Sequence, residues 1–246
     1  MKVLVVGATG ATGTLLLEQL LERGHEVKAI VRSSEKIPQP VKNHAKLKLI
    51  EGELLKLDDE EMAQHVKGCD AVASCLGHNI TIKGMYGHPR RLVTDAAKRL
   101  TKAIAATHPE KKVKYILMNT SGNRNRSIKE PIALGQRMVT ALLRLLLPPH
   151  VDNEKAADFL WRNIGNEHKQ LEWVAVRPDG LINEDKISEY EIHPSPIRNP
   201  IFNPGKTSRI NVAHFMASLI DDDEIWQKWK GQMPVIYNEQ PATINE

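Results

Sequence analysis

Short apolar runs alternate along the chain with longer stretches in which apolar residues recur every three or four positions. The short runs are continuously apolar, which is typical of strands buried on both faces of a parallel sheet. The longer stretches, such as "TLLLEQLLERG" and "VTDAAKRLTKAIAATH", have the spacing of amphipathic helices, and Gly24 ends the first as a C-terminal cap. The expected strands are Val3–Val6, Val27–Val31, Leu47–Ile50, Ala71–Cys75, Tyr115–Met118 and Trp173–Val176. This alternation predicts an α/β fold, a doubly wound parallel sheet with helices on both faces.

Two parts of the chain depart from the alternation. The segment Ser121–Pro149 is unusually long for a connection between a strand and a helix, polar at its start and apolar at its end. After Val176 the chain becomes irregular and rich in proline, and it then resumes with a helix at "VAHFMASLIDDD" and a strand at "PVIY". That tail is too small to stand alone. We therefore expect a single domain over residues 1–246, in which about 178–246 form a small substrate-side cap.

Composition and charge narrow the classes of function. Hydrophobic residues make up 41% of the 246 residues and charged residues 26%, an ordinary balance for a soluble domain. Basic residues exceed acidic ones by a net charge of +4 but are scattered among them, so we expect no nucleic-acid partner. No apolar run is long enough to span a bilayer, and the apolar start breaks at Gly7 too early for a signal peptide. Cys69 and Cys75 fit neither a disulfide framework nor a zinc site. These features predict a cytoplasmic protein without membrane contact or metal.

The most informative stretch is "VLVVGATGATGTLLLEQL" at the N-terminus. An apolar strand runs into three glycines spaced G-x-x-G-x-x-G, and a helix starts at once. Gly7 permits the tight turn, Gly10 lets the backbone approach a pyrophosphate, and Gly13 brings helix and strand together. The unpaired amides of the helix N-terminus then face the negative charge. The loop therefore predicts a Rossmann-type dinucleotide site formed by Gly7, Thr9, Gly10, Ala11, Thr12 and Gly13.

The end of the second strand indicates which dinucleotide binds. An acidic residue at this place accepts from the ribose 2′-hydroxyl of NAD, whereas arginine accommodates the 2′-phosphate of NADP. This chain continues "AIVRSSEK" and offers Arg32, Ser33 and Ser34. A guanidinium suits phosphate geometry. We expect NADP as the cofactor, with NAD possible.

With these pieces in place the chain resembles the atypical short-chain dehydrogenase/reductases, and most closely the NAD(P)H-binding, NmrA-like and flavin or biliverdin-IX-beta reductase-like members. The resemblance is carried by "GATGATG", "VRSSEK", "EGELLKLDDEEMAQHVKGCDAVASCLG", "ILMNTSG", "EWVAVRPDGL" and "SRINVAHFMASLI". These motifs cover most of the chain in order. They leave 122–149 and part of 194–206 unmatched.

The resemblance implies a set of cofactor contacts along the carboxyl ends of the strands. It places Gly52, Glu53 and Leu54 around the adenine, with Glu53 standing where the family more often has aspartate. Next to the inner ribose it places Ser74, Cys75, Leu76 and Gly77. It further implies that Asn119, Thr120 and Ser121 lie beneath the nicotinamide and that the stretch from Pro178 to Leu181 passes over it. From the residues alone, we expect Cys75 to be a small buried residue and Arg177 a buried, paired arginine. Ser121 is either catalytic or a capping residue.

The proton donor of the superfamily is missing. Its classical members use a Tyr-x-x-x-Lys pair on the helix after the fifth strand. None of the four tyrosines here, Tyr86, Tyr115, Tyr190 and Tyr237, has a lysine four residues later. When Asp158 is aligned with the usual glutamate of this helix, His150 and Glu154 take the two positions, and a shift by one residue gives Val151 and Lys155 instead. His150 is therefore a candidate donor, or else a helix-entry residue before Asp152 as the N-cap.

Two functions remain open. One is an NADP(H)-dependent oxidoreductase that passes hydride to a small conjugated acceptor such as a flavin or quinone. The alternative is a non-catalytic, NADP(H)-binding redox sensor of the NmrA type, and a sugar-nucleotide epimerase is a distant third. Arg124, Arg126 and Lys129 either attract an anionic ligand or lie in a solvated loop. Val139–Leu147 could cover the site, pack on the core or form a dimer face, so we expect a monomer or a homodimer with a small-molecule substrate.

Overall fold

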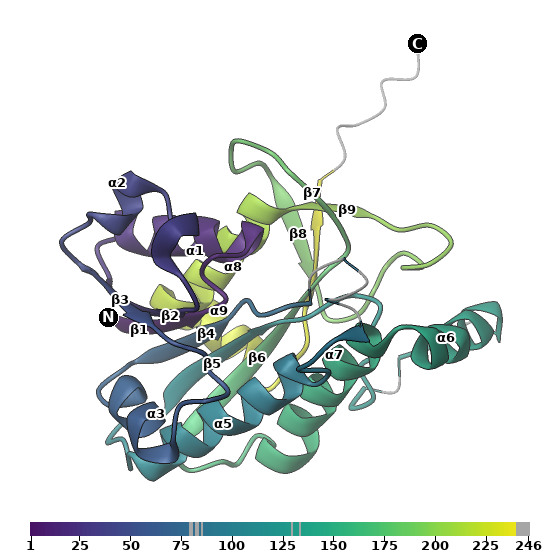
Figure 1. Cartoon of the computed structure of the whole chain (residues 1–246). Helices are drawn as coiled ribbons and strands as arrows, with labels where there is room; N and C mark the ends of the chain where they lie inside the picture. The colour runs from purple at the N-terminus through teal and green to yellow at the C-terminus, as the bar shows by residue number, and fades with distance from the viewer. Residues whose placement is uncertain (79–80, 82–83, 85, 129, 133, 240–246) are drawn as a thin grey trace.

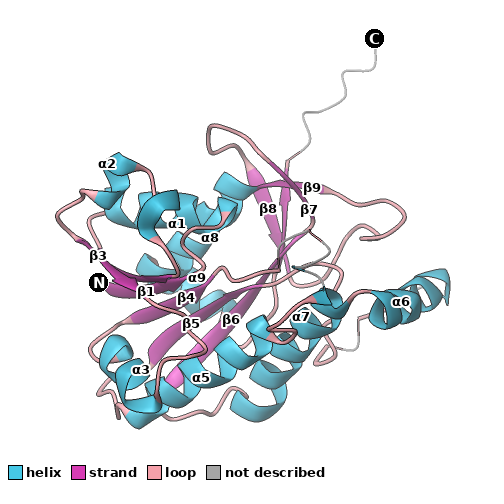
Figure 2. Cartoon of the chain, in the orientation of Figure 1, coloured by secondary structure: helices cyan, strands magenta, loops and turns pink. Residues whose placement is uncertain are grey.

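The computed structural model describes residues 1–78, 81, 84, 86–128, 130–132 and 134–239. Its centre is an eight-stranded sheet in the order β3-β2-β1-β4-β5-β6-β10-β8 (Figure 2). Every neighbouring pair in it is parallel except β10 and β8. The strands are β1 (Lys2–Val6), β2 (Glu26–Val31), β3 (Leu47–Glu51), β4 (Ala71–Ser74), β5 (Val113–Met118), β6 (Leu171–Pro178), β8 (Tyr190–His193) and β10 (Val235–Asn238). All six strands expected from the apolar runs are present, which confirms the doubly wound fold.

The strand order contains the crevice that such sheets use for ligands. From β1 the chain builds outward to β2 and β3, and it then returns to the other side of β1 to place β4, β5 and β6. The connections on either side of the β1–β4 boundary therefore leave the sheet in opposite directions. Open α/β sheets bind their ligands beyond the carboxyl ends of the strands at this switch point.

Helices cover both faces of the sheet, in two layers (Figure 1). One layer holds α1 (Ala11–Glu22), α2 (Gln39–Lys42), α8 (Arg209–Asp221) and α9 (Asp223–Trp229), and the other holds α3 (Asp59–Val66), α5 (Leu92–Ala106) and α7 (Pro148–Phe159). The short apolar strands serve both layers because successive side chains point to opposite faces. In β1, Val3 and Val5 pack toward the first layer while Leu4 and Val6 pack toward the second, and all four are buried.

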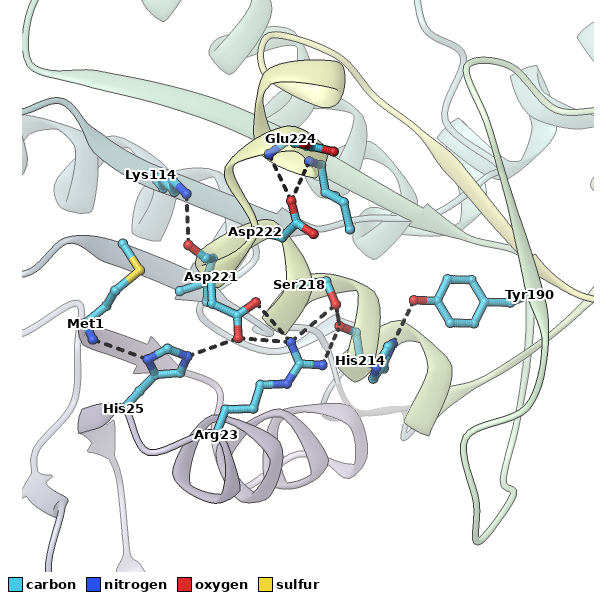
Figure 3. Close-up of polar contacts among 12 residues, drawn as sticks. Met1, Arg23, His25, Lys114, Tyr190, His214, Ser218, Asp221, Asp222 and Glu224 are labelled. Atoms are coloured by element: carbon cyan, nitrogen blue, oxygen red, sulfur yellow. Dashed lines mark hydrogen bonds and ion pairs between the residues drawn. The ribbon is translucent and has the colours of Figure 1, made fainter.

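A polar network joins the two ends of the chain on the first layer (Figure 3). Arg23, at the C-terminus of α1, donates to Asp221 at 3.1 Å and to Ser218 at 3.2 Å on α8. His25 lies 3.3 Å from Asp221, and the Met1 amine lies 3.3 Å from His25. Gly24 has a φ of +81° and donates to Leu21, as a capping glycine does. Helix α8 is thus fixed to the glycine-loop helix α1.

The segment after β6 contributes to the main sheet as well as to its rim. The expected "PVIY" strand is β10, which pairs with β6, and α8 packs against α1. A small separate sheet pairs β7 (Gly180–Ile182) with β9 (Lys206–Ser208) in parallel. Among the described residues after β6, β7, β9 and the loops around them therefore lie outside the main sheet and its helix layers.

The long connection after β5 contains a helix of its own, α6 (Leu134–Leu146), which projects from the body of the molecule (Figure 1). Leu142 and Leu145 on this helix are exposed, whereas Thr140 is buried. A shorter π-helical turn, Leu160–Ile164, follows α7, and a 3₁₀ turn, Ser34–Lys36, follows β2.

One expectation about α7 is wrong. Asp152 was expected to be its N-cap, but the helix already begins at Pro148, and Asp152 is buried inside it. Its carboxylate instead accepts from the amides of Val93 at 2.8 Å and Thr94 at 3.0 Å, so that it caps the N-terminus of α5. Two prolines at the first positions of α7, where no amide hydrogen is needed, explain the earlier start. Asp152 and Glu154 are therefore paired side chains at internal contacts and not a solvated helix face.

Candidate active site

The glycine loop is packed so tightly that side chains could not replace its glycines. Gly7 has a φ of +78°, and the amide of Gly10 closes the turn onto the Gly7 carbonyl at 3.0 Å. A Cβ on Gly13 would lie 2.1 Å from that carbonyl oxygen, and a Cβ on Gly7 would lie 2.5 Å from the carbonyl carbon of Cys75. The loop thus brings α1 against β1 and β4, and no side chain caps the N-terminus of α1 within the described residues. This geometry fits a pyrophosphate.

A cavity of about 350 Å³ opens at this loop, beyond the carboxyl ends of β1 to β4. We call it the glycine-loop cavity. Its lining includes twelve of the residues predicted from the sequence: Gly7, Thr9, Gly10, Ala11, Thr12, Arg32, Gly52, Glu53, Leu54, Cys75, Leu76 and Gly77. They come from four separate segments of the chain. The parallel sheet brings these segments together because the strands all end at one edge.

Other predicted residues lie beside this cavity but do not line it. Gly13 lies beneath the loop, and Ser33 caps the 3₁₀ turn by accepting from the Glu35 amide. The Ser34 hydroxyl accepts from Lys42 at 3.0 Å. Ser74 is fully buried under the cavity floor.

Sequence reasoning missed several lining residues. Lys36 adds a second cation close to Arg32 in sequence, and Arg209 adds a third from the start of α8. The signal for Lys36 was available, because a 3₁₀ turn can bring a residue four positions after the strand back to the strand end. Arg209 comes from a segment almost two hundred residues away along the chain, and no local pattern indicates that contact.

A second and larger cavity, of about 1050 Å³, is lined in part by the residues that follow β5. Met118, at the end of β5, lines the glycine-loop cavity, whereas Ser121 and Gly122 line the second. Five arginines line this second space, and we call it the arginine cavity: Arg124, Arg126, Arg137, Arg144 and Arg198. Lys129, which was predicted to join the first two of them, lies outside the described residues.

The sequence matches the family described as NAD(P)H-binding over residues 7–223, which is most of the chain. The chain belongs to the NAD(P)H-binding family. The resemblance noted from the motifs is thereby confirmed at the level of the family.

Individual relatives of this NAD(P)H-binding chain show the fold more than the activity. A 3-beta-hydroxysteroid dehydrogenase from Mycolicibacterium neoaurum is 39% identical over 71 residues, which span 29% of this chain and 18% of that protein. A short-chain dehydrogenase/reductase from Veillonella parvula, solved in complex with NADP, has a TM-score of 0.67 at 17% identity and covers 98% of this chain and 95% of its own. A Streptococcus pneumoniae protein described as an NADH-flavin reductase has a TM-score of 0.64 at 18% identity, over 97% and 100%. At these identities the two solved structures show a shared fold.

The residues expected beneath the nicotinamide are tied to one another in this NAD(P)H-binding chain. Ser121 donates its hydroxyl proton to Asp179 at 3.0 Å, and the second oxygen of Asp179 accepts from the Gly205 amide at 2.9 Å. Asn119 donates to the Asn153 carbonyl on α7 at 3.1 Å, and its side-chain oxygen accepts from the Thr120 amide at 2.8 Å. Pro178 is buried at the end of β6, and Leu181 on β7 is 36% exposed. These contacts pin the ends of β5 and β6 together.

His150 lies beside Gly122, which lines the arginine cavity, but His150 itself is in the lining of neither cavity. A Cβ built on Gly122 would lie 3.9 Å from the His150 Cε1 atom. The His150 side chain is 12% exposed, and its Nε2 atom is buried with no hydrogen-bond partner among the described residues. Burial lowers the His150 pKa below its ordinary value, against a smaller opposing effect of Glu154 3.6 Å away. Glu154 lines the arginine cavity while Lys155 is exposed, so this face of α7 presents His150 and Glu154.

His78, which follows β4, and Asp152, on α7, form a buried pair. His78, which lines the glycine-loop cavity, places Nε2 2.8 Å from the Asp152 carboxylate. Burial by itself would raise the pKa of Asp152, but donors from His78, Thr94 and Val93 outweigh it and lower the pKa. The pair connects the end of β4 to α7.

Arg177 is a buried, paired arginine, as expected. It donates in bidentate fashion to Glu130 at 2.6 and 3.0 Å, and to the carbonyls of Asn123 and Met233. Both side chains are almost fully buried. The pair anchors the connection after β5 to β6, beneath the arginine cavity.

Two other chemistries have no support among the described residues. The Cys75 thiol is packed 4.0 Å from the Met216 sulfur, and burial raises its pKa to about 12, so the thiolate is scarce at neutral pH. No group of three His, Cys, Asp or Glu side chains is arranged to hold a metal within the part of the chain that the structure describes. Within that same part, no helix has the length and apolar character of a membrane span.

Proposed function

We propose that this chain is an NADPH-dependent oxidoreductase that transfers hydride to a small conjugated acceptor, such as a flavin or a quinone. The observation that carries the proposal is the glycine-loop cavity. The N-terminus of α1, which no described side chain caps, fits a pyrophosphate, and Arg32 and Lys36 place two cations at the end where the adenine ribose of a dinucleotide would lie. Among the predicted contacts, Thr9, Gly10, Ala11 and Thr12 would hold the pyrophosphate and Gly52, Glu53 and Leu54 the adenine.

The preference for NADPH over NADH rests on these cations. A 2′-phosphate carries about two negative charges, and a guanidinium offers it paired donors. The glutamate on this side of the cavity, Glu53, is engaged by Lys56 at 2.8 Å. The cofactor supplies the hydride when it is bound. The chain's residues bind, orient and shield it.

The acceptor class follows from the missing tyrosine and lysine. Without that pair, no phenol of lowered pKa can protonate a carbonyl oxygen, so simple ketones are poor candidates. A flavin or quinone accepts hydride readily and spreads the resulting charge, and its proton can come from water or from His150. The position of the His150 ring beside Gly122, with an Nε2 atom that has no hydrogen-bond partner among the described residues, supports the latter source. Ser121 would act by positioning, because its hydroxyl already donates to Asp179.

A second candidate is a non-catalytic NADP(H)-binding sensor of a redox state. The observation that favours it is the same absence of the Tyr-x-x-x-Lys pair on α7. An exposed apolar surface on α6, including Leu142 and Leu145, would then be available to a partner. The two candidates share the cofactor and differ only in turnover.

One experiment separates them. Purified protein is titrated with NADPH and NADH, and oxidation of the better ligand is then followed with flavins, quinones and aldehydes. If the chain is the proposed oxidoreductase, NADPH should bind more tightly than NADH. A flavin or quinone should then oxidise NADPH, and an aldehyde should not. Tight NADPH binding without oxidation by any acceptor would favour the sensor. Stronger binding of NADH would contradict the assignment of Arg32 and Lys36.

A further inference from the structure

The arginine cavity is built from the parts of the chain that the family motifs do not cover. Its lining comes from 121–154, which includes α6, and from the loop at 195–200. At about 1050 Å³ it is large enough for a ring system with a side chain. Apart from Ser121 and Gly122, its lining therefore does not follow from the motifs that carry the family resemblance.

Carboxylates neutralise only some of its arginines. Arg144 donates to Glu154 through two nitrogens, at 2.8 Å each, and Arg126 donates to Asp158 at 2.7 Å. The other glutamate of the lining, Glu130, is taken up by Arg177. These pairs leave no carboxylate at the cavity free for a further arginine.

Three arginines of the lining remain without a charged partner. Within the described ranges, Arg124, Arg137 and Arg198 have no carboxylate within 4.0 Å. Arg124 uses Nε to donate to the Glu130 carbonyl at 2.7 Å, and Arg198 donates to Asn203 at 3.1 Å. The Nε atom of Arg198 is buried and has no hydrogen-bond partner among the described residues, which is an uncommon state for a buried donor. Three uncompensated cations around one cavity attract an anion, and a guanidinium matches the oxygens of phosphate and carboxylate.

The other end of the cavity faces the expected site of chemistry. Ser121 and Gly122 line it after the end of β5, and the Cε1 atom of His150 lies close to Gly122. A ligand with its reducible ring at Gly122 would extend toward Arg124, Arg137 and Arg198.

We propose that the arginine cavity binds an acceptor that carries a phosphate or carboxylate group, and that Arg124, Arg137 and Arg198 receive this group. That the bound molecule is a hydride acceptor rests on the proposed function. The binding of its anionic group does not. The chemical class is thus an anionic conjugated acceptor, and a neutral ring alone would bind more weakly.

Flavins offer a matched pair for the test, because FMN is riboflavin with a phosphate added. Binding is measured by quenching of flavin fluorescence, without NADPH, so that it does not depend on turnover. We expect FMN to bind at least about tenfold more tightly than riboflavin, and rising salt to weaken FMN alone. Arg137→Gln and Arg198→Gln should each remove about tenfold of FMN affinity and leave riboflavin unchanged. Arg162→Gln is the control, because Arg162 is exposed on the π-helical turn and does not line the cavity.

A naphthoquinone with and without a carboxylate side chain distinguishes the two anions. If the anionic member binds more tightly only in the flavin pair, the site is assigned to phosphate. If it binds more tightly in both pairs, the site accepts either anion. Equal binding within both pairs, or variants that weaken the neutral and the anionic member alike, would overturn the proposal. If FMN binds through the arginines but NADPH is never oxidised, the proposed function fails and the anion site stands. If NADPH is oxidised equally by riboflavin and FMN in all variants, the anion site fails and the proposed function stands.

Discussion

The two cavities of this molecule are built in opposite ways. The glycine-loop cavity is formed by backbone and small side chains at the ends of regular strands, where even one added carbon on Gly13 would collide with the Gly7 carbonyl. The arginine cavity is formed by long side chains on a helix and two loops, and Glu130 and Arg177 hold its base. The first is the cavity proposed for the cofactor of the NAD(P)H-binding family. The second is the cavity proposed for the acceptor.

The difference teaches where specificity can change without harming the fold. Strand ends are fixed by the sheet, so the cofactor contacts follow from topology. By contrast, Arg137 and Arg144 lie on α6, which projects from the body of the molecule (Figure 1), and Arg198 lies on the 195–200 loop. Substitutions in the two cavities should therefore affect different ligands.

The largest effect on cofactor binding is expected at Gly13. Gly13→Ala places a Cβ 2.1 Å from the Gly7 carbonyl oxygen and forces α1 away from β1. We expect the dissociation constant for NADPH to rise at least ~100-fold, about 2.7 kcal/mol. Gly77→Ala is the matched control, because it lines the same cavity and its Cβ would meet no atom within 4 Å. Titration of both variants with NADPH checks the result. Equal losses in the two would contradict the packing argument.

Removal of Glu130 should damage the other cavity. Glu130→Ala leaves the guanidinium of Arg177 buried without its carboxylate, which costs about 3 to 5 kcal/mol of the free energy of unfolding. Chemical denaturation measures this loss, and Glu191→Gln, at an exposed pair with His193, should lose less than about 1 kcal/mol. In protein that remains folded, we expect FMN binding to weaken more than NADPH binding. The reverse order would show that the two cavities are not separate.

A smaller and more selective effect is expected at the ribose end of the glycine-loop cavity. Arg32→Gln and Lys36→Gln each remove one charged donor, and each should lower the ratio of NADPH to NADH affinity by about tenfold. Lys42→Gln is the control, since Lys42 donates to Ser34 and does not line the cavity. An unchanged ratio in both variants would place the discrimination elsewhere.

The smallest effect is expected at His150. If its imidazolium donates the proton, the rate should fall as pH rises through the His150 pKa, because the acid form is lost above it. Burial lowers that pKa, so the fall should occur below the ordinary value near 6.5. His150→Gln should flatten this profile and slow flavin reduction by no more than about tenfold, because water can replace the donor. A pH profile that the substitution leaves unaltered would remove His150 from the chemistry.

The contrast between the cavities also explains what the sequence could predict. The strands and the glycine loop follow from local patterns, and twelve of the predicted cofactor residues line one cavity because parallel strands end together. Asp152 was misassigned because its partners, the Val93 and Thr94 amides, lie almost sixty residues away. The convergence of Arg137 and Arg198 depends on how α6 and a distant loop pack. No pattern within either segment carries that information.

The central claim is that the two cavities work as one site for hydride transfer, joined at the end of β5. The most direct test is a single-turnover reaction of the NADPH-loaded protein with FMN, using NADPH deuterated at one or the other hydrogen of its nicotinamide C4. A bound and oriented cofactor predicts that FMN reduction slows with only one of the two deuterated forms. Equal rates with both forms, or no oxidation of the bound NADPH by any flavin or quinone, would contradict the claim.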